Sequence, residues 1–427
     1  MLLKEISFLN SKREILLFIL LSLFILTYTI LIEYHNYKQL THFDSAIVYA
    51  TVIKQYTKTK LSKTGKLKNY QVLKLKADKG YTFYTTKSKT LENIKGKKVM
   101  LELWLQDITF YQYMQTFFGY TRFIKIEKKQ TLKQKLNNSL AKIHQNSDIT
   151  SIYQALYTAT PLPKELQQIF STLGISHLLA ISGFHLGVLS TLLFFLLKYP
   201  YSFFQNRYFP YRSAKVDIFI VVAFLELIYL LFLDIPPSLL RAFTMLLIGF
   251  LLYDRGFKVI SMQTLTLTII VILIFAPRLL FSLGFWLSVS GVFYIFLFLI
   301  YFKKLNSLWQ LLLVPLWVYI MMLPLSLFIF KNFTIYHPIS IIWTSLFTLF
   351  YPLSIFLHLI GLGTLLDSSL LWLLELAPKQ TSQVELNISI FLSFMLLSFM
   401  GIFWKKAIWI LIPYSFAIFI YAMKTTE

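Results

Sequence analysis

The sequence predicts a polytopic α-helical membrane protein with about 10–11 transmembrane helices, and a small extracytoplasmic β-barrel of the OB type inserted after the first helix. Three observations indicate this fold class. Of the 427 residues, 57% are hydrophobic and only 14% are charged, which is not the balance of a soluble globular protein. Apolar runs of about 20 residues, long enough to cross a ~30 Å hydrocarbon core, recur along the chain. A basic segment with β-strand periodicity separates the first run from the second.

The apolar runs are the predicted membrane spans, and the basic residues between them predict their orientation. Basic residues before the first run place the N-terminus in the cytoplasm, and the lack of a cleavage site after it predicts a retained helix. The run at 365–377 is short and contains Glu375; if it does not cross, the C-terminus changes side. The predicted spans are 15–32, 176–198, 216–234, 238–252, 258–275, 279–301, 308–330, 339–360, 365–377, 387–404 and 407–423.

The segment that follows the first span is predicted to lie outside the membrane. It carries most of the net charge of +22, with 21 Lys and Arg against 6 Asp and Glu between Lys38 and Lys135. Short β-branched and aromatic stretches predict about five strands, which suits an OB-type barrel. The expected strands are 46–56, 70–78, 80–86 and 97–107. The predicted domains are 1–40 (N-terminus and first helix), 41–129 (OB-like), 130–174 (amphipathic interfacial helices) and 175–427 (transmembrane domain).

Lysines interleaved with tyrosines in this outer domain have the chemistry that binds single-stranded nucleic acid, because ammonium groups meet phosphates and aromatic rings stack on bases. A solvated basic surface, codon bias toward lysine, or lysines near anionic lipid headgroups would give the same composition. The candidate DNA-binding residues are Lys54, Lys58, Lys60, Lys63, Lys66, Lys68, Tyr70, Lys74, Lys76, Tyr81 and Tyr84.

A second candidate site lies in the stretch HLLAISGFHLGVLS, which places polar residues in an otherwise apolar run. Ionisable groups within a span usually face protein or water and mark functional sites. The two glycines form a GxxxG pair, which predicts close approach of another helix. The alternative is a packing seam without further function. The candidate residues are His177, Ser182, Gly183, His185 and Gly187.

Three further groups of polar residues interrupt the spans. In DIPPSLLRAFTM, Pro237 begins a helix that Ser238 is expected to cap, and Arg241 offers a planar fork suited to phosphate. Snorkelling to the headgroups is the alternative for this arginine. Glu226 lies in mid-span and needs a partner, for which Arg241 or His185 is a candidate. The stretch FSLGFWLSVSGVF adds Gly284, Phe285, Ser288 and Ser290, with helix packing as the alternative.

The motifs give little support to catalysis. An intramembrane hydrolase would need Ser182 and a histidine such as His337 or His358, but no GxSxG elbow surrounds this serine. The chain has no cysteine, which excludes thiolate nucleophiles, disulfides and thiolate metal sites. No GxxxxGK[ST] loop occurs. We therefore expect no enzyme activity, cofactor or metal; the alternatives are such a hydrolase and a non-catalytic transporter of a small anion or lipid.

GISHLLAISGFHLGVL (174–189) resembles the signature of the ComEC-type competence proteins, a G-x-x-H-L-L-A-I-S-G-x-H-x-G run. PPSLLRAFTM is similar to the family's P-S-x-x-R-A-x-x-M element. APRLLFSLGFWLSVSGVF is similar to its N-P-x-x-L-x-x-x-G-F-x-L-S block, with Ala276 in place of Asn and Trp286 where Gln is common. The resemblance covers nearly the whole chain, but the HxHxDH motif of the metallo-β-lactamase-like domain that many relatives carry is not present.

The resemblance implies a channel in the bacterial inner membrane that passes single-stranded DNA into the cytoplasm during natural transformation. The outer domain would receive the strand, and the polar residues of the spans would line its path. Because a negative interior opposes each phosphate by about 2.3 kcal/mol per 100 mV, an energy source is required, and Glu226, His177 and His185 are candidates for proton coupling. The implied partners are single-stranded DNA, the lipid bilayer, a periplasmic DNA-receptor protein, a cytoplasmic motor or strand-binding protein, and further copies of the chain in a homo-oligomer.

Overall fold

The computed structural model describes residues 11–61, 67–89, 91–105, 107–127, 131–377 and 382–425, with the backbone alone at 60, 61, 67 and 68. The chain forms two compact units. The sheet unit comprises Leu9–Ser139 and Ile270–Leu283, and the helical unit comprises Leu140–Ile269 and Gly284–Glu427.

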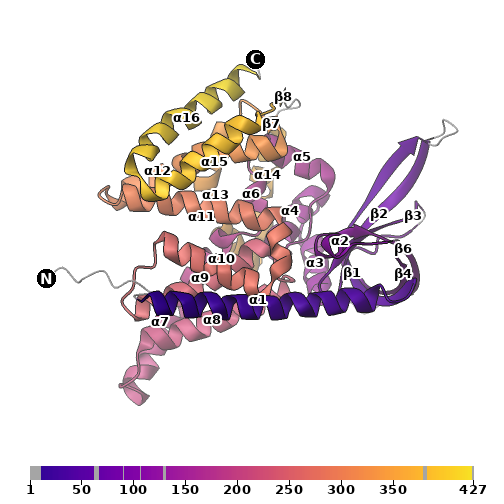
Figure 1. The fold of residues 1–427 in the computed structure, drawn as a ribbon, viewed down its shortest axis with the longest axis horizontal. Helices are drawn as coiled ribbons and strands as arrows, with labels where there is room; N and C mark the ends of the chain where they lie inside the picture. Colours follow the sequence, from indigo (N-terminus) through magenta and orange to yellow (C-terminus); the bar gives the residue numbers. More distant parts are fainter. Residues whose placement is uncertain are drawn as a thin grey trace. The chain divides into compact units, whose positions relative to one another are not determined.

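The sheet unit begins with one long helix and continues into a six-stranded sheet (Figure 1). Ser11 and Glu14 form a capping box at the start of α1 (Lys12–Leu40). The strand order is β5-β3-β2-β1-β4-β6, and every pair is antiparallel except β3 with β5. The elements are β1 (Ser45–Leu61), β2 (Leu67–Ala77), β3 (Thr82–Ser88), β4 (Lys98–Trp104), α2 (Phe110–Met114), β5 (Phe117–Phe118) and β6 (Tyr120–Ile126).

The first four strands lie where the sequence predicts them, although β1 continues to Leu61 instead of ending near residue 56. Their inward side chains form the apolar core, in which Leu73, Leu75 and Phe83 are fully buried. Among the described residues no backbone ladder joins the edge strands β5 and β6, so the closed OB-type barrel is not shown. Contacts that involve side chains connect β3 to β6: the hydroxyls of Thr85 and Thr121 lie 2.9 Å apart, and Lys87 Nζ donates to the Thr121 carbonyl oxygen.

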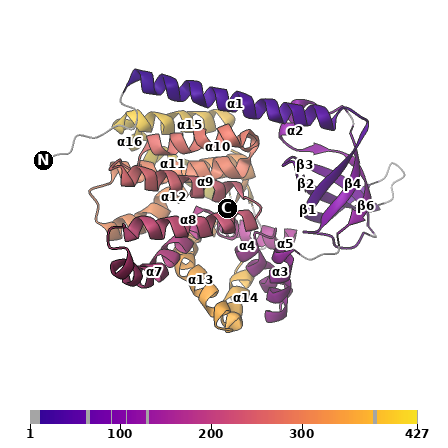
Figure 2. The same cartoon turned by 90° about the horizontal axis from the view of Figure 1, so that it is seen from below.

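The helical unit is built from apolar helices, of which α7 and α8 run side by side (Figure 2). The remaining helices of the described chain, in order, are α3 (Leu132–Ile143), α4 (Ser147–Thr158), α5 (Lys164–Thr172), α6 (Ser176–Leu179), α7 (Gly183–Tyr208), α8 (Ala214–Phe232), α9 (Pro237–Asp254), α10 (Met262–Phe275), η1 (Pro277–Phe281), α11 (Leu283–Tyr301), α12 (Ser307–Phe330), η2 (His337–Ile339), α13 (Ser340–Leu359), η3 (Gly363–Leu366), α14 (Asp367–Glu375), α15 (Ile388–Phe403) and α16 (Lys405–Lys424). Two short strands, β7 (Asn332–Phe333) and β8 (Ser382–Gln383), pair with each other.

Seven of the described helices are long and apolar enough to cross a membrane, which confirms a polytopic helical membrane protein. They are α1, α7, α9, α11, α12, the segment His337–Leu359 that contains α13, and α16. The apolar helices α10 and α15 are shorter. The predicted span at 365–377 contains only η3 and the nine residues of α14. Nine residues extend about 13 Å, too short to cross a ~30 Å core, so this predicted span is wrong.

A second correction concerns the predicted span 176–198, which is not one helix. The chain forms the four-residue helix α6, leaves helical geometry after Leu179, and starts α7 at Gly183. The signature stretch therefore lies at a helix break. A broken helix frees backbone polar groups that side chains must satisfy.

Helices α4, α5 and α6 pack against α13 and α14 through an apolar cluster that includes Tyr153, Phe170 and Tyr351 (Figure 2). The Nε2 atom of His337, before α13, lies 3.0 Å from the Ser171 carbonyl oxygen, so this packing extends to the start of α13. The position of 130–174 at the membrane surface stays a prediction.

Candidate translocation site

The signature stretch builds the start of α7. Ser182 is the N-cap residue, and its side chain accepts a hydrogen bond from the backbone N–H of Phe184 at 3.3 Å. His185, one turn later, accepts the Ser182 backbone N–H at Nδ1 over 3.2 Å, which completes a capping box. Ser182 and His185 thus close the broken helix end, and their spacing of three residues serves this cap.

The second sequence block attaches to the same break. Ser238 Oγ donates to the Ile181 carbonyl oxygen at 2.6 Å, which satisfies one of the backbone groups freed between α6 and α7. The sequence predicted instead that Ser238 caps its own helix, but Pro236 occupies the N-cap position and Pro237 is the first residue of α9. The prolines therefore start the helix as predicted, while the serine side chain bonds to a neighbouring segment.

Arg241, one turn into α9, connects all three sequence blocks. Its Nε donates to Ser288 Oγ of α11 at 2.8 Å. A Cβ atom at Gly183 would lie 2.8 Å from Nη2 of this arginine and 3.1 Å from the Cβ of Ala242, so only glycine permits this approach. Arg241 is 5% exposed, and no carboxylate among the described residues pairs with it. A buried guanidinium without a counter-ion is costly, and such groups mark functional sites.

The turn that leads into α9 holds a rare backbone geometry. Asp234 and Ile235 adopt φ values of 65° and 57°. Positive φ is uncommon for any residue with a side chain and strained for a β-branched one. Residues held in such regions cluster at ligand sites and switches. Asp234 and Ile235 lie three and two residues before Pro237, the first residue of α9.

Glu226 of α8 is fully buried and pairs with neither of the partners the sequence suggested. Its Oε1 accepts a hydrogen bond from Ser190 Oγ of α7, and its Oε2 has no partner among the described residues. His185 is also buried, with its Nε2 unpartnered and its ring 4.5 Å from that of Tyr351 on α13. Both residues lie in the helical unit with unused hydrogen-bonding capacity.

The other candidates of the spans are more scattered. His177 Nε2 lies 3.2 Å from Thr344 Oγ1 of α13, away from the residues around Arg241. Gly187 has open space where its Cβ would be, so of the GxxxG pair only Gly183 permits a close contact. On α11, Phe285 is fully buried, Ser290 is half-buried and Gly284 is exposed.

The outer candidates converge on the outward face of the sheet unit. Lys54 of β1 pairs in register with Lys74 of β2, which pairs with Tyr84 of β3. Lys58 pairs with Tyr70 four residues farther along the same strands. Because side chains alternate in a strand, these five residues share one face, which we call the lysine–tyrosine face. Lys76 and Tyr56 lie on this face by the same alternation.

The electrostatics of this face favour an anion. The Nζ of Lys74 lies 5.4 Å from the ring centroid of Tyr84. Burial, and next the charge of Lys54, lower the pKa of Lys74. A phosphate placed between Lys54 and Lys74 would relieve their repulsion.

Tyr81 is a wrong prediction as a base-stacking residue. It is 2% exposed, and its ring packs in the core against Phe83, Tyr113 and Phe117. Lys63 and Lys66 lie outside the described residues. The side chains of Lys60 and Lys68 are not described, although their backbones pair with each other in the β1–β2 ladder.

Two polar clusters were missed at the level of sequence. In the sheet unit, Arg278 of η1 makes a bidentate ion pair with Glu33 of α1, with N–O distances of 2.8 and 2.5 Å. Its guanidinium also lies 4.5 Å from the ring centroid of Tyr113. Burial by itself would lower the pKa of Arg278, but the hydrogen bonds and charge of Glu33 outweigh burial and raise it. The sequence did contain a signal for this pair: Arg278 follows the apolar run 258–275, and Glu33 follows the apolar run 15–32.

The second missed cluster joins His144, Asp367 and His358 in the helical unit. His144 Nδ1 lies 2.9 Å from Asp367 Oδ2, and its Nε2 lies 3.0 Å from His358 Nε2. More than 200 residues separate His144 from the other two. Among the described residues no group of three or more His, Cys, Asp or Glu is arranged to hold a metal ion.

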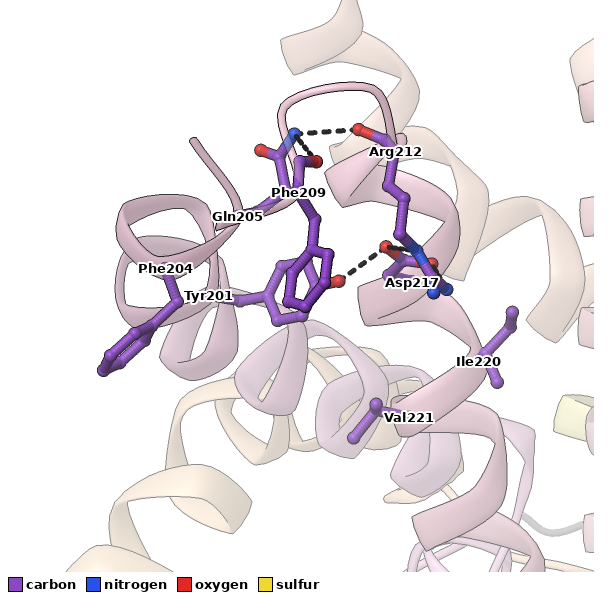
Figure 3. A pocket seen from close by; sticks show the side chains of 8 residues that line it. All are labelled: Tyr201, Phe204, Gln205, Phe209, Arg212, Asp217, Ile220 and Val221. Carbon is purple, nitrogen blue, oxygen red and sulfur yellow. Dashed lines mark hydrogen bonds and ion pairs between the residues drawn. The ribbon is translucent and has the colours of Figure 1, made fainter. Parts of the chain in front are cut away.

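A shallow hollow of about 270 Å³ lies at the turn between α7 and α8, apart from the residues around Arg241 (Figure 3). Arg212 donates two hydrogen bonds of 2.9 and 2.6 Å to the Asp217 carboxylate, and the Tyr201 hydroxyl donates a third. These contacts fix the turn between the two helices, and both oxygens of the carboxylate accept hydrogen bonds within the protein. The hollow is lined by Tyr201, Phe204, Gln205, Phe209, Arg212, Asp217, Ile220 and Val221.

The helix break and the three blocks that meet at it fall within one family match. The model of the Competence protein family matches residues 158–426, which is more than half of the chain. The chain belongs to the Competence protein family. This confirms the ComEC-type resemblance carried by the signature, and the match contains every candidate residue of the spans.

This Competence family protein is similar to two curated proteins over part of their length. It is 34% identical over 194 residues to ComE operon protein 3 of Bacillus subtilis (strain 168), covering 44% of this chain and 23% of that protein. It is 30% identical over 148 residues to an uncharacterized protein of Aquifex aeolicus (strain VF5), covering 34% of this chain and 32% of that protein. The matched part spans less than a third of either relative. No solved structure matches the chain.

Proposed function

We propose that this protein is a channel of the bacterial inner membrane that passes single-stranded DNA into the cytoplasm during natural transformation. The observation that carries the proposal is the lysine–tyrosine face, where Lys54, Lys58 and Lys74 alternate with Tyr70 and Tyr84 on adjacent strands. Cations for phosphates beside rings for bases are what single-stranded nucleic acid requires. Membership of the Competence protein family agrees with this function.

In this proposal the sheet unit lies outside the cytoplasm and acts as an OB-like receiving domain. The Thr85–Thr121 contact between β3 and β6 supports a barrel-like curvature. The strand then passes the buried Arg241, whose phosphate-binding fork has no protein counter-ion among the described residues. A periplasmic DNA-receptor protein, a cytoplasmic motor or strand-binding protein, and further copies of the chain are the proposed partners.

We further propose that the chain itself is not an enzyme. A hydrolase based on Ser182 would need a base that takes the serine proton. His185 Nδ1 lies 3.1 Å from Ser182 Oγ, but the same nitrogen accepts the Ser182 backbone N–H, and both residues belong to the helix cap. His337 and His358 make their own contacts, with the Ser171 carbonyl and with His144. The geometry around Ser182 is that of a cap, and we place no catalytic role on it.

The test measures binding of a labelled single-stranded oligonucleotide to the full-length protein in lipid nanodiscs across a salt series. Each phosphate contact contributes about −0.7 to the slope of log K against log salt. Lys54→Gln with Lys74→Gln should make the slope shallower by about 1.4. Tyr84→Ala should weaken binding by about 1–3 kcal/mol, whereas Tyr81→Phe in the core should not change it.

The matched control replaces two exposed lysines of α3, Lys135→Gln with Lys142→Gln, which remove the same charge at positions that are not part of the lysine–tyrosine face. Equal losses in both double variants would mean that binding follows net charge alone, and would contradict a receiving face. Binding no tighter than that of empty nanodiscs with anionic lipid would contradict the proposal altogether.

A further inference from the structure

The inference concerns the cluster of His144, His358 and Asp367, which no role in DNA passage accounts for. His144 follows α3, His358 ends α13, and Asp367 begins α14, so the cluster joins three segments of the helical unit. His144 is 3% exposed and its ring stacks on that of Tyr153 at 4.5 Å. A Cβ atom at Gly363 would lie 2.9 Å from His358 Cδ2, so the backbone there closes tightly on the ring.

The hydrogen bonds of the cluster fix where its protons lie. His358 Nδ1 is 2.7 Å from the Ser354 carbonyl oxygen, which can only accept, so this nitrogen carries a proton. The Tyr157 hydroxyl, 3.2 Å from the same nitrogen, donates to Ser354 Oγ at 2.9 Å, and Ser354 Oγ donates to the Tyr351 carbonyl. The tyrosine oxygen is therefore free to act as a second acceptor for the His358 proton.

Two more protons follow from the remaining contacts. The 2.9 Å contact between His144 Nδ1 and Asp367 Oδ2 requires one proton between them. The 3.0 Å contact between the two Nε2 atoms requires another, because two unprotonated nitrogens would only repel. The cluster thus holds three protons, whereas a carboxylate and two neutral imidazoles hold two.

The third proton makes the cluster neutral overall, either as a carboxylate with one imidazolium or as a carboxylic acid with two neutral rings. Neutrality suits its burial, since among the described residues no lysine or arginine forms an ion pair with Asp367. The Asp367 Oδ1 atom is buried without a partner, which costs less for an uncharged acid than for a carboxylate.

The other titratable groups against the two rings are Tyr153 and Tyr157 of α4. Burial raises the pKa of both tyrosines, so they stay protonated through the neutral range and contribute no charge. Because both tyrosines keep their protons, the third proton of the cluster is the one whose loss would change the charge around the two rings.

We propose that His144, Asp367 and His358 form a single proton-binding site, and that release of its third proton breaks the Nε2–Nε2 hydrogen bond tying the α3–α4 junction to the end of α13. Loss of this proton leaves two neutral rings whose facing nitrogens are both acceptors. The sequence had placed proton coupling at Glu226, His177 or His185; this cluster differs from them in having a complete hydrogen-bond chain. The assignment does not depend on the DNA-channel function.

The first measurement is the ¹⁵N spectrum of the histidine-labelled, full-length protein in lipid bilayers between pH 6 and 9, which distinguishes protonated from unprotonated ring nitrogens. We expect one pair of coupled ring nitrogens, absent in His144→Gln, that loses a single shared proton as the pH rises. Two imidazoles that titrate independently, or ring nitrogens whose protonation does not change at any pH in this range, would overturn the proposal. The wild-type titration needs no variant to fold.

Asp367→Asn should move this transition to lower pH by at least one unit, because a shared proton without the carboxylate would leave a buried positive charge. The matched control is Asp148→Asn, an exposed acid in the first turn of α4. An unchanged transition in Asp367→Asn would show that the carboxylate is not part of the site and would overturn the assignment.

A structural readout uses the absence of natural cysteines. Spin labels at Gln145→Cys and Leu359→Cys, both exposed and each one residue from a histidine of the cluster, report the separation of the α3–α4 junction from the end of α13. The distance distribution should widen as the ¹⁵N transition occurs, and should stay wide at all pH values in His144→Gln. A distance that is constant across a proven proton loss would refute the tie between the segments.

Discussion

The two units each hold an arginine with little solvent exposure, and they treat it in opposite ways. In the sheet unit, Arg278 is held by both oxygens of Glu33 and by the ring of Tyr113. In the helical unit, Arg241 has Ser288 Oγ as its hydrogen-bonded oxygen and no carboxylate among the described residues. An arginine paired with a carboxylate contributes to the stability of the fold, whereas a buried arginine without a carboxylate partner indicates a site for an anionic ligand.

The other polar groups of the two units differ less sharply. The lysine–tyrosine face lies on the opposite side of the strands from the largely apolar core. Both units bury polar atoms without a partner among the described residues, Tyr113 Oη and Arg278 Nη1 in the sheet unit and His185 Nε2 and Glu226 Oε2 in the helical unit. The sheet unit nevertheless presents its lysines at the surface, whereas the helical unit encloses Glu226 and an arginine without a carboxylate partner.

The largest expected effect separates function from stability at Arg241. Arg241→Met keeps the side-chain length and removes the charge, so the protein should reach the membrane in normal amounts with equal or higher thermal stability. If the guanidinium meets the phosphates of the strand, transformation should fall to background. The measurement pairs transformation frequency with the amount of protein in the membrane fraction.

Arg255→Met is the control for this variant, since Arg255 is exposed just after the end of the same helix. Normal transformation by Arg241→Met would assign the unpaired arginine to helix packing and would remove the main contrast between the units.

The opposite outcome is expected at Arg278. Arg278→Met leaves Glu33 half-buried without its partner, which should destabilise the sheet unit by about 3 kcal/mol. Amide hydrogen exchange of β1–β4 in the full-length protein should accelerate accordingly. The double variant with Glu33→Gln should recover part of the loss, because it removes the stranded carboxylate.

Arg122→Met, on the exposed side of β6, provides the matched control and should change exchange little. If amide exchange in Arg278→Met equals that of the wild type, the Arg278–Glu33 ion pair does not stabilise the sheet unit. The contrast between a structural Arg278 and a ligand-binding Arg241 would then be wrong.

The sheet unit could be predicted from the sequence more fully than the candidate site could. Alternation of side chains placed β1–β4 within a few residues, and the even-numbered positions Lys54, Lys58 and Lys74 share one face as a strand requires. The same rule would have corrected one error, because Tyr81 and Tyr84 have opposite parity and cannot share a face of the predicted strand 80–86. Closure of the sheet depends on edges that no local pattern specifies.

The helical site resisted prediction because its contacts join distant segments. The sequence blocks were recognised as motifs, yet the bond of Ser238 to Ile181 and that of Arg241 to Ser288 depend on how helices pack. Apolar content also predicted a continuous span at 176–198, since Leu, Ile and Ala continue through the break after Leu179. A helix break inside an apolar stretch becomes visible only when backbone groups are followed to their partners.

The smallest expected effect tests the lysine–tyrosine face by its pH dependence. Burial and the charge of Lys54 lower the pKa of Lys74, so this lysine loses its proton at a lower pH than an ordinary lysine, whose pKa is about 10.4. Binding of a short single-stranded oligonucleotide to the full-length protein should therefore weaken as the pH rises toward that lowered pKa. Lys54→Gln removes the repulsion, so its weakening should begin at higher pH, although its affinity at pH 7 is lower. An identical pH profile in both proteins would mean that Lys74 does not contact the strand, and that the outward charge of the sheet unit acts only as a diffuse field.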